Sequence, residues 1–398
     1  MILYRAAWIL PIAAPPIHDG WVLVDAGVIR AVGAPGDVPA DPSRETVDLG
    51  PAAVLPGLVN AHTHLELSWM RGQVPPAASM PEWASRLIAR RRSVGEEPIA
   101  PTEDAVRELR AAGTALVGDV TNTLSAYDVL TRAEVSGAIF RELLGFNPAD
   151  PERVVAGAQA QNGELRPVSR LRVSLAAHAP YSVSPALFRA IGRTLGDRPM
   201  SVHLGESAEE LQFLRDGTGA WREILGRLGV WNDRWEPPGC GPVEYLDRLG
   251  LVNSRLLAVH GTHFEARELA RLTGAHATVV TCPRSNRWTG AGTPPIERFY
   301  ASDVRVAIGT DSLASVEDLN LFAEMAAVRA LAPAVPASRI LASATRDGAA
   351  ALGFGAELGT IEPGKRADLI AVRTPPGLTD VEEYLLGGIE PDRIRWLS

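Results

Sequence analysis

The stretch VLPGLVNAHTHLELSWMRG, residues 54–72, joins an apolar run typical of a buried strand to two closely spaced histidines, His62 and His64. Side chains alternate between the two faces of a strand, so both imidazoles are expected on the same side. Paired imidazoles at a strand end are candidates for metal binding. Because an isolated His-x-His sequence is weak evidence, further ligands have to come from the rest of the chain.

Seven later segments repeat the pattern of a short apolar strand followed by a longer amphipathic run. Helices are indicated at residues 102–113, 184–196, 265–274 and 316–331, several of which open on Ser or Thr and close on Gly. Eight alternations of strand and helix predict an α/β fold, a parallel (β/α)8 barrel of the TIM type. The strand candidates are residues 53–64, 114–121, 138–146, 171–180, 200–207, 255–263, 277–286 and 304–312.

The two ends of the chain differ from its middle. Residues 1–55 carry strand and turn signals, and the tail from Gly359 again predicts strand, turn and strand. We therefore expect a small β-sandwich domain built from both termini, residues 1–55 plus 359–398, beside a barrel domain of residues 56–358. The segment Val230–Pro242, with two Trp and three Pro, is interpreted as an ordered loop insertion.

The predicted strand ends carry most of the residues suited to chemistry. In a TIM barrel the active site lies at the carboxyl ends of the strands. Besides His62 and His64, these ends carry His178, His203, Glu206, His260 and Asp311. The imidazoles of His62, His64 and His203 with the carboxylate of Asp311 would form a site for one divalent metal, with zinc as the first candidate and iron(II) as the alternative.

Each of these residues also has a purely structural interpretation. Single histidines such as His203 or His260 are more often hydrogen-bonded parts of a core, and Asp311 in GTDS could be a turn or helix cap. Their common position at one end of consecutive predicted strands favours the metal-site interpretation.

Composition argues against several other classes of protein. The formal charge is −8 without a basic tail, so we expect no nucleic-acid partner. No apolar run is long enough to cross a bilayer, and we expect no membrane partner. The two cysteines are too few for a disulfide framework, which predicts a cytoplasmic protein. The first residues are interpreted as folded structure rather than a signal peptide, because Pro11 interrupts their apolar run.

With these residues in place, the chain resembles the amidohydrolase superfamily over nearly its whole length, including LPGLVNAHTH and LGTIEPGKRADLIAV. The motifs HAPYSVS, HLGES, CPRSN and GTDSLAS resemble the branch that deaminates purines and related rings. The resemblance implies that His62, His64, His203 and Asp311 hold the metal. It also implies that Glu206, His260 and Asp311 are the catalytic residues.

The lysine content bears on the number of metals. Superfamily members with two metals usually bridge them through a carboxylated lysine on strand 4, but Lys365 is the only lysine here and lies in the tail. The resemblance therefore implies one metal per chain and hydrolytic deamination. In that reaction Asp311 accepts a proton from the attacking water, His260 stabilises the developing charge, and Glu206 protonates the ring nitrogen.

The substrate is indicated by finer resemblances. Adenosine-type members carry an acid after strand 1 that binds ribose hydroxyls, and Arg92 stands at that position here. The segments IARRR, GTGAW, GPVEYLDRLGL and VTCPRSN resemble the aminodeoxyfutalosine deaminases of menaquinone biosynthesis, whose substrate bears a carboxyphenyl group that an arginine would suit. We expect a small-molecule substrate bound by His178, Arg71, Arg92, Ser285 and Asn286.

Several alternatives stay open at this point. They are deamination of methylthioadenosine, S-adenosylhomocysteine or guanine, hydrolytic dechlorination of triazine-type rings, and a metal-binding barrel without catalysis. The intact set of Glu206, His260 and Asp311 speaks against the last of these. Barrels of this kind are often dimers or larger, which leaves a homodimer as an expectation.

Overall fold

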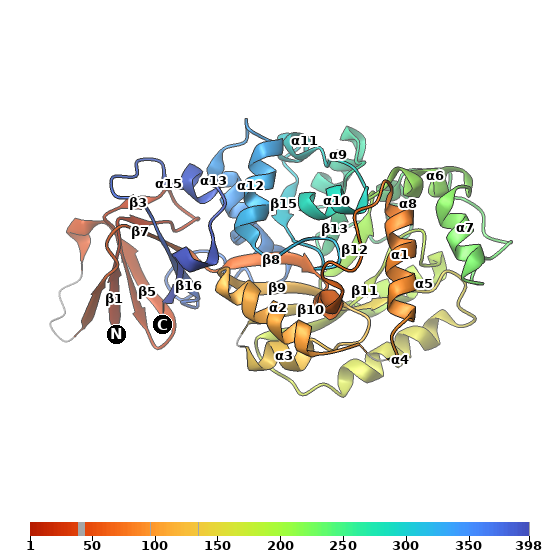
Figure 1. Ribbon diagram of the computed structural model, residues 1–398, viewed down its shortest axis with the longest axis horizontal. Coiled ribbons are helices and arrows are strands. Elements are labelled where there is room, and N and C mark those ends of the chain that lie inside the picture. Colours follow the sequence, from red (N-terminus) through yellow and green to blue (C-terminus); the bar gives the residue numbers. More distant parts are fainter. Residues whose placement is uncertain (39–43, 96, 134, 398) are drawn as a thin grey trace.

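The computed structural model describes residues 1–38, 44–95, 97–133 and 135–397. Figure 1 shows a β-rich part that holds both chain ends, on the left, beside a larger part in which helices surround parallel strands. No helix among the described residues is long and apolar enough to cross a membrane.

The larger part contains the eight predicted parallel strands. They form two four-stranded sheets in the orders β11-β10-β9-β8 and β12-β13-β14-β15. Most of their residues are buried, as expected for strands covered on both faces. The strands are β8 (Leu58–Thr63), β9 (Thr114–Thr121), β10 (Ser136–Leu143), β11 (Leu171–Ala177), β12 (Met200–Leu204), β13 (Leu256–His260), β14 (Thr278–Thr281) and β15 (Arg305–Ile308).

The two sheets meet at two seams without a continuous ladder of strand pairing. At one seam the N–H groups of Thr310 and Asp311 donate to the carbonyl of His62 at 3.1 and 3.0 Å. At the other, the N–H of His203 donates to the carbonyl of His178 at 2.9 Å. The prediction of a closed barrel sheet is corrected accordingly. At the first seam Asp311, with a φ of 62°, forms an isolated parallel bridge with Thr63 that does not continue as a ladder.

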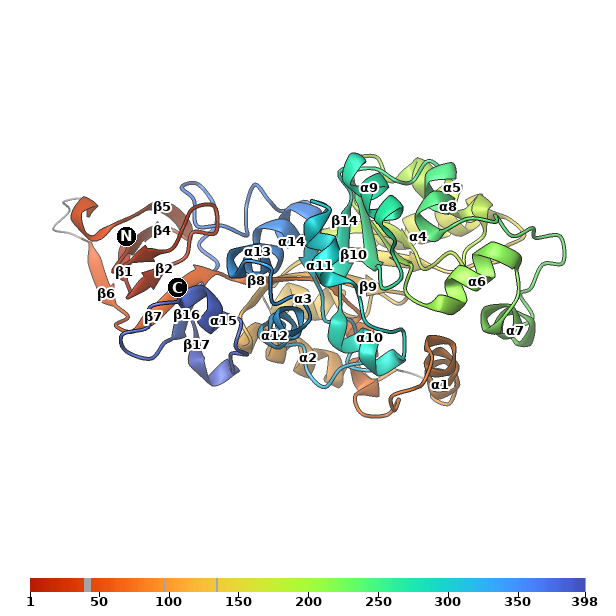
Figure 2. The same cartoon turned by 90° about the horizontal axis from the view of Figure 1, so that it is seen from above.

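Helices connect and cover these strands (Figures 1 and 2). The predicted helix at 316–331 begins later than expected, because Asn320 caps it by accepting from the N–H of Phe322. The helices are α1 (Met80–Arg92), α2 (Ala100–Ala111), α3 (Tyr127–Arg132), α4 (Pro151–Gly163), α5 (Pro185–Thr194), α6 (Ala208–Asp216), α7 (Ala220–Arg227), α8 (Pro242–Arg248), α9 (Ala266–Gly274), α10 (Pro283–Thr289), α11 (Ile296–Ala301), α12 (Leu321–Leu331), α13 (Ala337–Ser343) and α14 (Arg346–Ala351).

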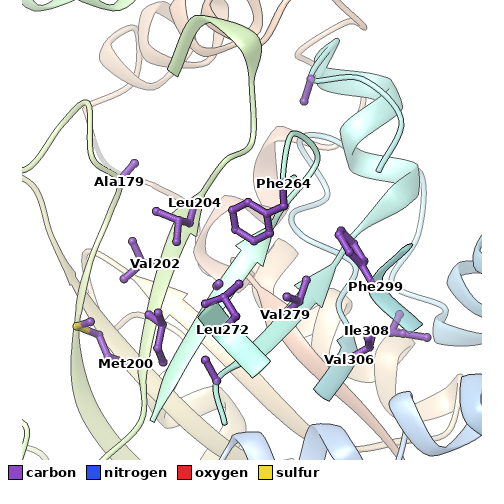
Figure 3. Packing of buried hydrophobic residues seen from close by; sticks show 14 of the residues in the cluster. Ala179, Met200, Val202, Leu204, Phe264, Leu272, Val279, Phe299, Val306 and Ile308 are labelled. Carbon is purple, nitrogen blue, oxygen red and sulfur yellow. The ribbon is translucent and has the colours of Figure 1, made fainter. Parts of the chain in front are cut away.

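Apolar packing between strands and helices fixes the wall of the barrel. Figure 3 shows Val202 of β12, Val279 of β14 and Ile308 of β15, which share one apolar cluster with Leu272 of α9 and Phe299 of α11. All five side chains are fully buried. Burying a side chain of this kind contributes about 1.5–3 kcal/mol, so the strand ends that carry the polar site rest on a rigid apolar layer.

The β-rich part combines the two chain ends in two sheets. The first has the order β5-β4-β1-β6, and the second, β17-β16-β7-β2-β3, places the last strands beside earlier ones. Apolar residues of both sheets share one cluster. The elements are β1 (Ile2–Arg5), β2 (Trp8–Ile9), β3 (Ile17–His18), β4 (Trp21–Asp25), β5 (Val28–Gly33), β6 (Glu45–Asp48), β7 (Ala52–Pro56), β16 (Leu369–Arg373), α15 (Val381–Leu385) and β17 (Ile394–Leu397).

Candidate metal and active site

Five side chains from four strand ends converge in the mouth of the barrel. Nε2 of His62 and Nε2 of His64 lie 3.7 and 3.6 Å from Oδ1 of Asp311. Nδ1 of His203 lies 3.0 Å from Nε2 of His260. All five residues are buried. The structure therefore brings together the histidines and the aspartate that the strand ends predicted.

The local backbone is bent to present these side chains. His260 and Asp311 both have positive φ, 76° and 62°, a conformation that residues other than glycine rarely adopt. A side chain on Gly309 would come within 2.8 Å of the carbonyl oxygen of His62, so glycine is required there. Backbone strain of this kind typically persists where function needs a fixed direction of the side chain.

The donor set fits a divalent metal. Neither ring nitrogen of His62 has a hydrogen-bond partner among the described residues, although the ring is fully buried. Ligand atoms of His62, His64 and Asp311 lie within 4.8 Å of one another, as do those of His62, His203 and His260. Buried imidazoles without partners are costly, and three imidazoles with one carboxylate suit zinc or iron(II).

Ser285 and Asn286 support this cluster from behind. The hydroxyl of Ser285 donates to Oδ2 of Asp311 at 2.5 Å, and Nδ2 of Asn286 lies 3.1 Å from Nδ1 of His260. Neither residue lines the cavity above the cluster. Their contact with substrate stays a prediction. The CPRSN motif runs from the end of β14 into α10, which places both side chains beneath Asp311 and His260.

Burial and nearby charges give the ionisable groups of the site different pKa values. Burial lowers the pKa of His62 to about 4. Burial also opposes protonation of His203, but the carboxylate of Glu142, with Oε1 3.6 Å from Nε2 of the ring, outweighs it and raises the pKa of His203 to about 9. Burial raises the pKa of Glu206 to about 8. The cluster thus combines a neutral nitrogen ligand with a carboxyl group that holds its proton at neutral pH.

Glu206 is positioned by the loop that follows β12. Gly205 has a φ of 62°, which turns the chain sharply after the strand. The N–H groups of Gly205 and Glu206 donate to the two carboxylate oxygens of Glu210, each at 3.0 Å. Oε1 of Glu206 lies 3.6 Å from Nε2 of His260, and its Oε2 has no hydrogen-bond partner in the described structure. One oxygen of this acid is therefore available to a substrate.

A cavity of about 210 Å³ lies above the cluster. Its floor is formed by the polar site residues, among them His64, His203, Glu206, His260 and Asp311. Its outer wall is apolar and comes from α1 and α7, which lie side by side at the end of the molecule far from the β-rich part (Figures 1 and 2). The wall residues are Met80, Trp83, Ala84, Leu87, Ile88, Trp221, Ile224, Leu225 and Leu228.

His178 lines this cavity as expected, but Arg71 and Arg92 do not. Nδ1 of His178 shares a hydrogen bond of 2.5 Å with Oγ of Ser182. Arg71 is paired with Glu108 at the surface, with Nη1 donating to Oε1 at 2.9 Å. Arg92 is exposed at the end of α1. The predicted substrate contacts of these two arginines stay predictions, and the turn of α1 directs the neighbouring Arg91 to the cavity.

Sequence reasoning missed several residues of the cavity. The structure adds Glu66, Arg91, Asn122, Glu142 and Tyr181. Glu142 lies near the carboxyl end of β10, so the rule that singled out the histidines could have found it. No comparable signal marked Arg91, since its role depends on the direction in which α1 turns.

Comparison with known proteins agrees with this geometry. The sequence model of the amidohydrolase family matches residues 53–389. The chain belongs to the amidohydrolase family. This amidohydrolase is 31% identical over 353 residues to an aminodeoxyfutalosine deaminase of Deinococcus radiodurans, covering 84% of this chain and 81% of the relative. It is 29% identical over 383 residues to a 5-methylthioadenosine/S-adenosylhomocysteine deaminase of Moorella thermoacetica, covering 93% and 85%.

Solved structures share the fold of this amidohydrolase. An adenosine deaminase from Xanthomonas campestris with bound zinc superposes with a TM-score of 0.84 at 30% identity, covering 99% of this chain and 90% of that one. Helicobacter pylori aminofutalosine deaminase in complex with methylthio-coformycin gives a TM-score of 0.87 at 24% identity, covering 97% and 95%. The second likeness bears on the fold alone.

Proposed function

We propose that this amidohydrolase is a metal-dependent deaminase that replaces the amino group of an adenine nucleoside with oxygen and releases ammonia. The observation that carries the proposal is the convergence of Glu206, His260 and Asp311 on the metal-type cluster at the floor of the cavity. The deaminases among its relatives support the same reaction class.

The residues of the floor have complementary roles in this reaction. The proposed ligands are His62, His64, His203 and Asp311, and zinc held there would lower the pKa of a water molecule towards about 7. Asp311 accepts the proton of the attacking water, and His260 beside it stabilises the developing charge. Glu206, which is protonated near neutral pH because burial raises its pKa to about 8, donates to the ring nitrogen next to the attacked carbon.

We propose 6-amino-6-deoxyfutalosine, an intermediate of menaquinone biosynthesis, as the substrate. The apolar wall formed by α1 and α7 includes Trp83 and Trp221 and suits an aryl group on the 5′ side of the nucleoside. Among the described residues, Arg91 is the one arginine that lines the cavity, and it would face the carboxylate of that substrate.

Methylthioadenosine is the second candidate, because the charge of Arg91 is already paired. Its Nη2 donates to Glu66 at 3.1 Å and its Nε donates to Glu97 at 2.5 Å. An arginine held by two carboxylates has little charge left for a third. The same apolar wall suits a methylthio group, which needs no cation.

An ammonia-release assay on purified, metal-analysed protein tests both proposals. The panel is aminodeoxyfutalosine, methylthioadenosine, S-adenosylhomocysteine, adenosine and guanine, with Glu206→Gln as the inactive control. A lead of aminodeoxyfutalosine by orders of magnitude in kcat/KM supports the first candidate, and a lead of methylthioadenosine supports the second. Failure of every substrate with one metal bound per chain would contradict the deaminase assignment.

A further inference from the structure

The carboxylate of Glu142 lines the cavity but has no part in the proposed deamination steps. It belongs to β10 and is 7% exposed. Nε2 of His203, on the floor, lies 3.6 Å from its Oε1, and Leu144, two residues further along, lines the cavity while 51% exposed. Glu142 therefore lies between the floor and the rim of the cavity.

The other acids of the cavity are held by protein contacts or take part in the proposed reaction. Oε2 of Glu66 accepts from the hydroxyls of Thr121 and Thr123 and from two backbone N–H groups, while its Oε1 accepts from Arg91. Glu206 and Asp311 face the histidines of the floor. Of the described residues that line the cavity, Glu142 is thus the carboxylate that remains for recognising a part of the substrate away from the reacting atoms.

Among the described residues, one oxygen of Glu142 accepts a hydrogen bond of normal length, while the other faces His203 as an ion-pair partner. Nδ2 of Asn122 donates to Oε2 at 3.0 Å and also contacts the backbone oxygen of Glu142 at 3.3 Å. Oδ1 of Asn122 in turn accepts from Arg91 at 3.1 Å, which fixes the amide. The contact of Oε1 with His203 at 3.6 Å is longer than the normal N–H···O range of about 2.7–3.2 Å. The carboxylate is therefore fixed in position by Asn122, and its Oε1 can accept a further hydrogen bond from a substrate.

The chemistry of an adenine nucleoside limits what this acceptor can bind. The unsubstituted ring nitrogens of adenine accept hydrogen bonds, and its amino group is the one that reacts at the floor. The remaining donors common to such nucleosides are the ribose hydroxyls. We propose that Glu142 accepts a hydrogen bond from the ribose diol and so selects ribonucleosides, an inference that rests on the proposed deaminase function.

The test compares one ribonucleoside with its 2′,3′-dideoxy counterpart. The probe is whichever nucleoside of the assay panel reacts fastest, and the variants are Glu142→Gln, Glu142→Asp and the matched control Glu97→Gln. Glu97 pairs with the same Arg91 but does not line the cavity. We expect Glu142→Gln to lose about 10- to 100-fold in kcat/KM on the ribonucleoside, as is typical for a hydrogen bond to a charged group, and less than about twofold on the dideoxy form.

The outcomes separate this inference from the proposed function. Equal losses on both substrates, or loss of bound metal from the variant, would overturn it, because Glu142 would then act through His203. If Glu142→Gln does not fold, Glu142→Asp takes its place. This variant keeps the charge but shortens the side chain by one methylene, and it must lose more kcat/KM on the ribonucleoside than on the dideoxy form. If the wild-type enzyme deaminates no nucleoside of the panel, the proposed function itself has failed.

Discussion

At the scale of single residues, burial decides which group of the site holds a proton. Glu206 and Asp311 are carboxylic acids in one cavity. Burial raises the pKa of Glu206 to about 8, while the nearby histidines hold the pKa of Asp311 well below its ordinary value against the effect of burial. The two acids are therefore suited to opposite tasks, donation by Glu206 and acceptance by Asp311.

Removing the acid should slow turnover strongly without removing the metal. Glu206→Gln keeps the shape of the side chain but cannot give up a proton to the ring nitrogen. We expect kcat to fall by about 10²- to 10⁴-fold, the usual contribution of general acid–base catalysis. Metal content measured on the same preparation should stay at the wild-type value. A variant with near wild-type kcat would remove Glu206 from the mechanism.

Metal binding should release a proton. Next to Glu142 the pKa of His203 is raised to about 9, so the metal-free protein carries this histidine charged at pH 7.5, whereas a ligand nitrogen must be neutral. Affinity should therefore rise with pH up to about 9 and level off above it. Because the pKa of His203 is higher in the folded protein than in the unfolded chain, protonation of His203 stabilises the metal-free fold. This stabilisation is complete below the ordinary pKa of 6.5 and is lost as the pH rises through 9.

Calorimetric titration with Zn²⁺ in buffers of different ionisation enthalpy measures this release. We expect about one proton per metal at pH 7.5. Glu142→Gln should reduce that number, because it removes the charge that keeps His203 protonated. Zinc affinity that does not change between pH 6.5 and 9 would show that His203 is neutral or is not a ligand.

The histidines could be predicted from sequence, while the substrate contacts could not. His62, His64, His203 and His260 follow from one rule, that strands of a parallel barrel end at the same face. Arg91 was missed in favour of Arg92 because successive residues of a helix point about 100° apart, and the sequence does not say which of them faces the cavity.

At the scale of elements, the loop between β12 and α6 depends on one buried acid. Both oxygens of Glu210 accept from backbone N–H groups, those of Gly205 and Glu206, and the side chain is fully buried. The sequence HLGESAEE showed Glu206 three residues after His203. The two hydrogen bonds that Glu210 accepts were not predicted, because they depend on the turn that Gly205 makes with positive φ.

Glu210→Ala should lower stability and kcat together. Two buried N–H donors would lose their acceptor, at a cost of about 1–3 kcal/mol each, and Glu206 would lose its fixed direction. We expect a lower Tm and a kcat reduced by about 10-fold or more, with metal content unchanged. Glu209→Ala, one residue earlier on α6, is the matched control and should change neither. A fall in Tm alone would show that Glu210 is merely structural.

At the scale of the whole molecule, the order of eight strands was predicted and confirmed, but the pairing between them was only partly right. A hydrophobic pattern predicts each strand because the burial of a strand is recorded in that strand's own sequence. The seams between β8 and β15 and between β11 and β12 depend instead on single contacts between neighbouring chains, such as the bridge between Thr63 and Asp311, which no sequence pattern indicates. The apolar wall of the cavity could not be predicted from the sequence either, since α1 and α7 come together only in the folded chain.

That wall should set the preference for the 5′ substituent. Trp221 of α7 lines the cavity and stacks on Tyr181 with ring centroids 3.8 Å apart. Trp221→Ala removes apolar contact surface from the outer cavity and leaves the floor in place. We expect kcat/KM to fall about 10-fold more for the better of methylthioadenosine and aminodeoxyfutalosine than for adenosine, consistent with about 1–3 kcal/mol per apolar group in a pocket.

The ratio of the two kcat/KM values on one preparation is the measurement, because it does not depend on the fraction of active protein. Trp231→Ala is the matched control, since Trp231 stacks on Phe146 outside the cavity and its loss should leave the ratio unchanged. An equal loss on adenosine would mean that Trp221 supports the floor through Tyr181, and the 5′ substituent would then have to be recognised by α1.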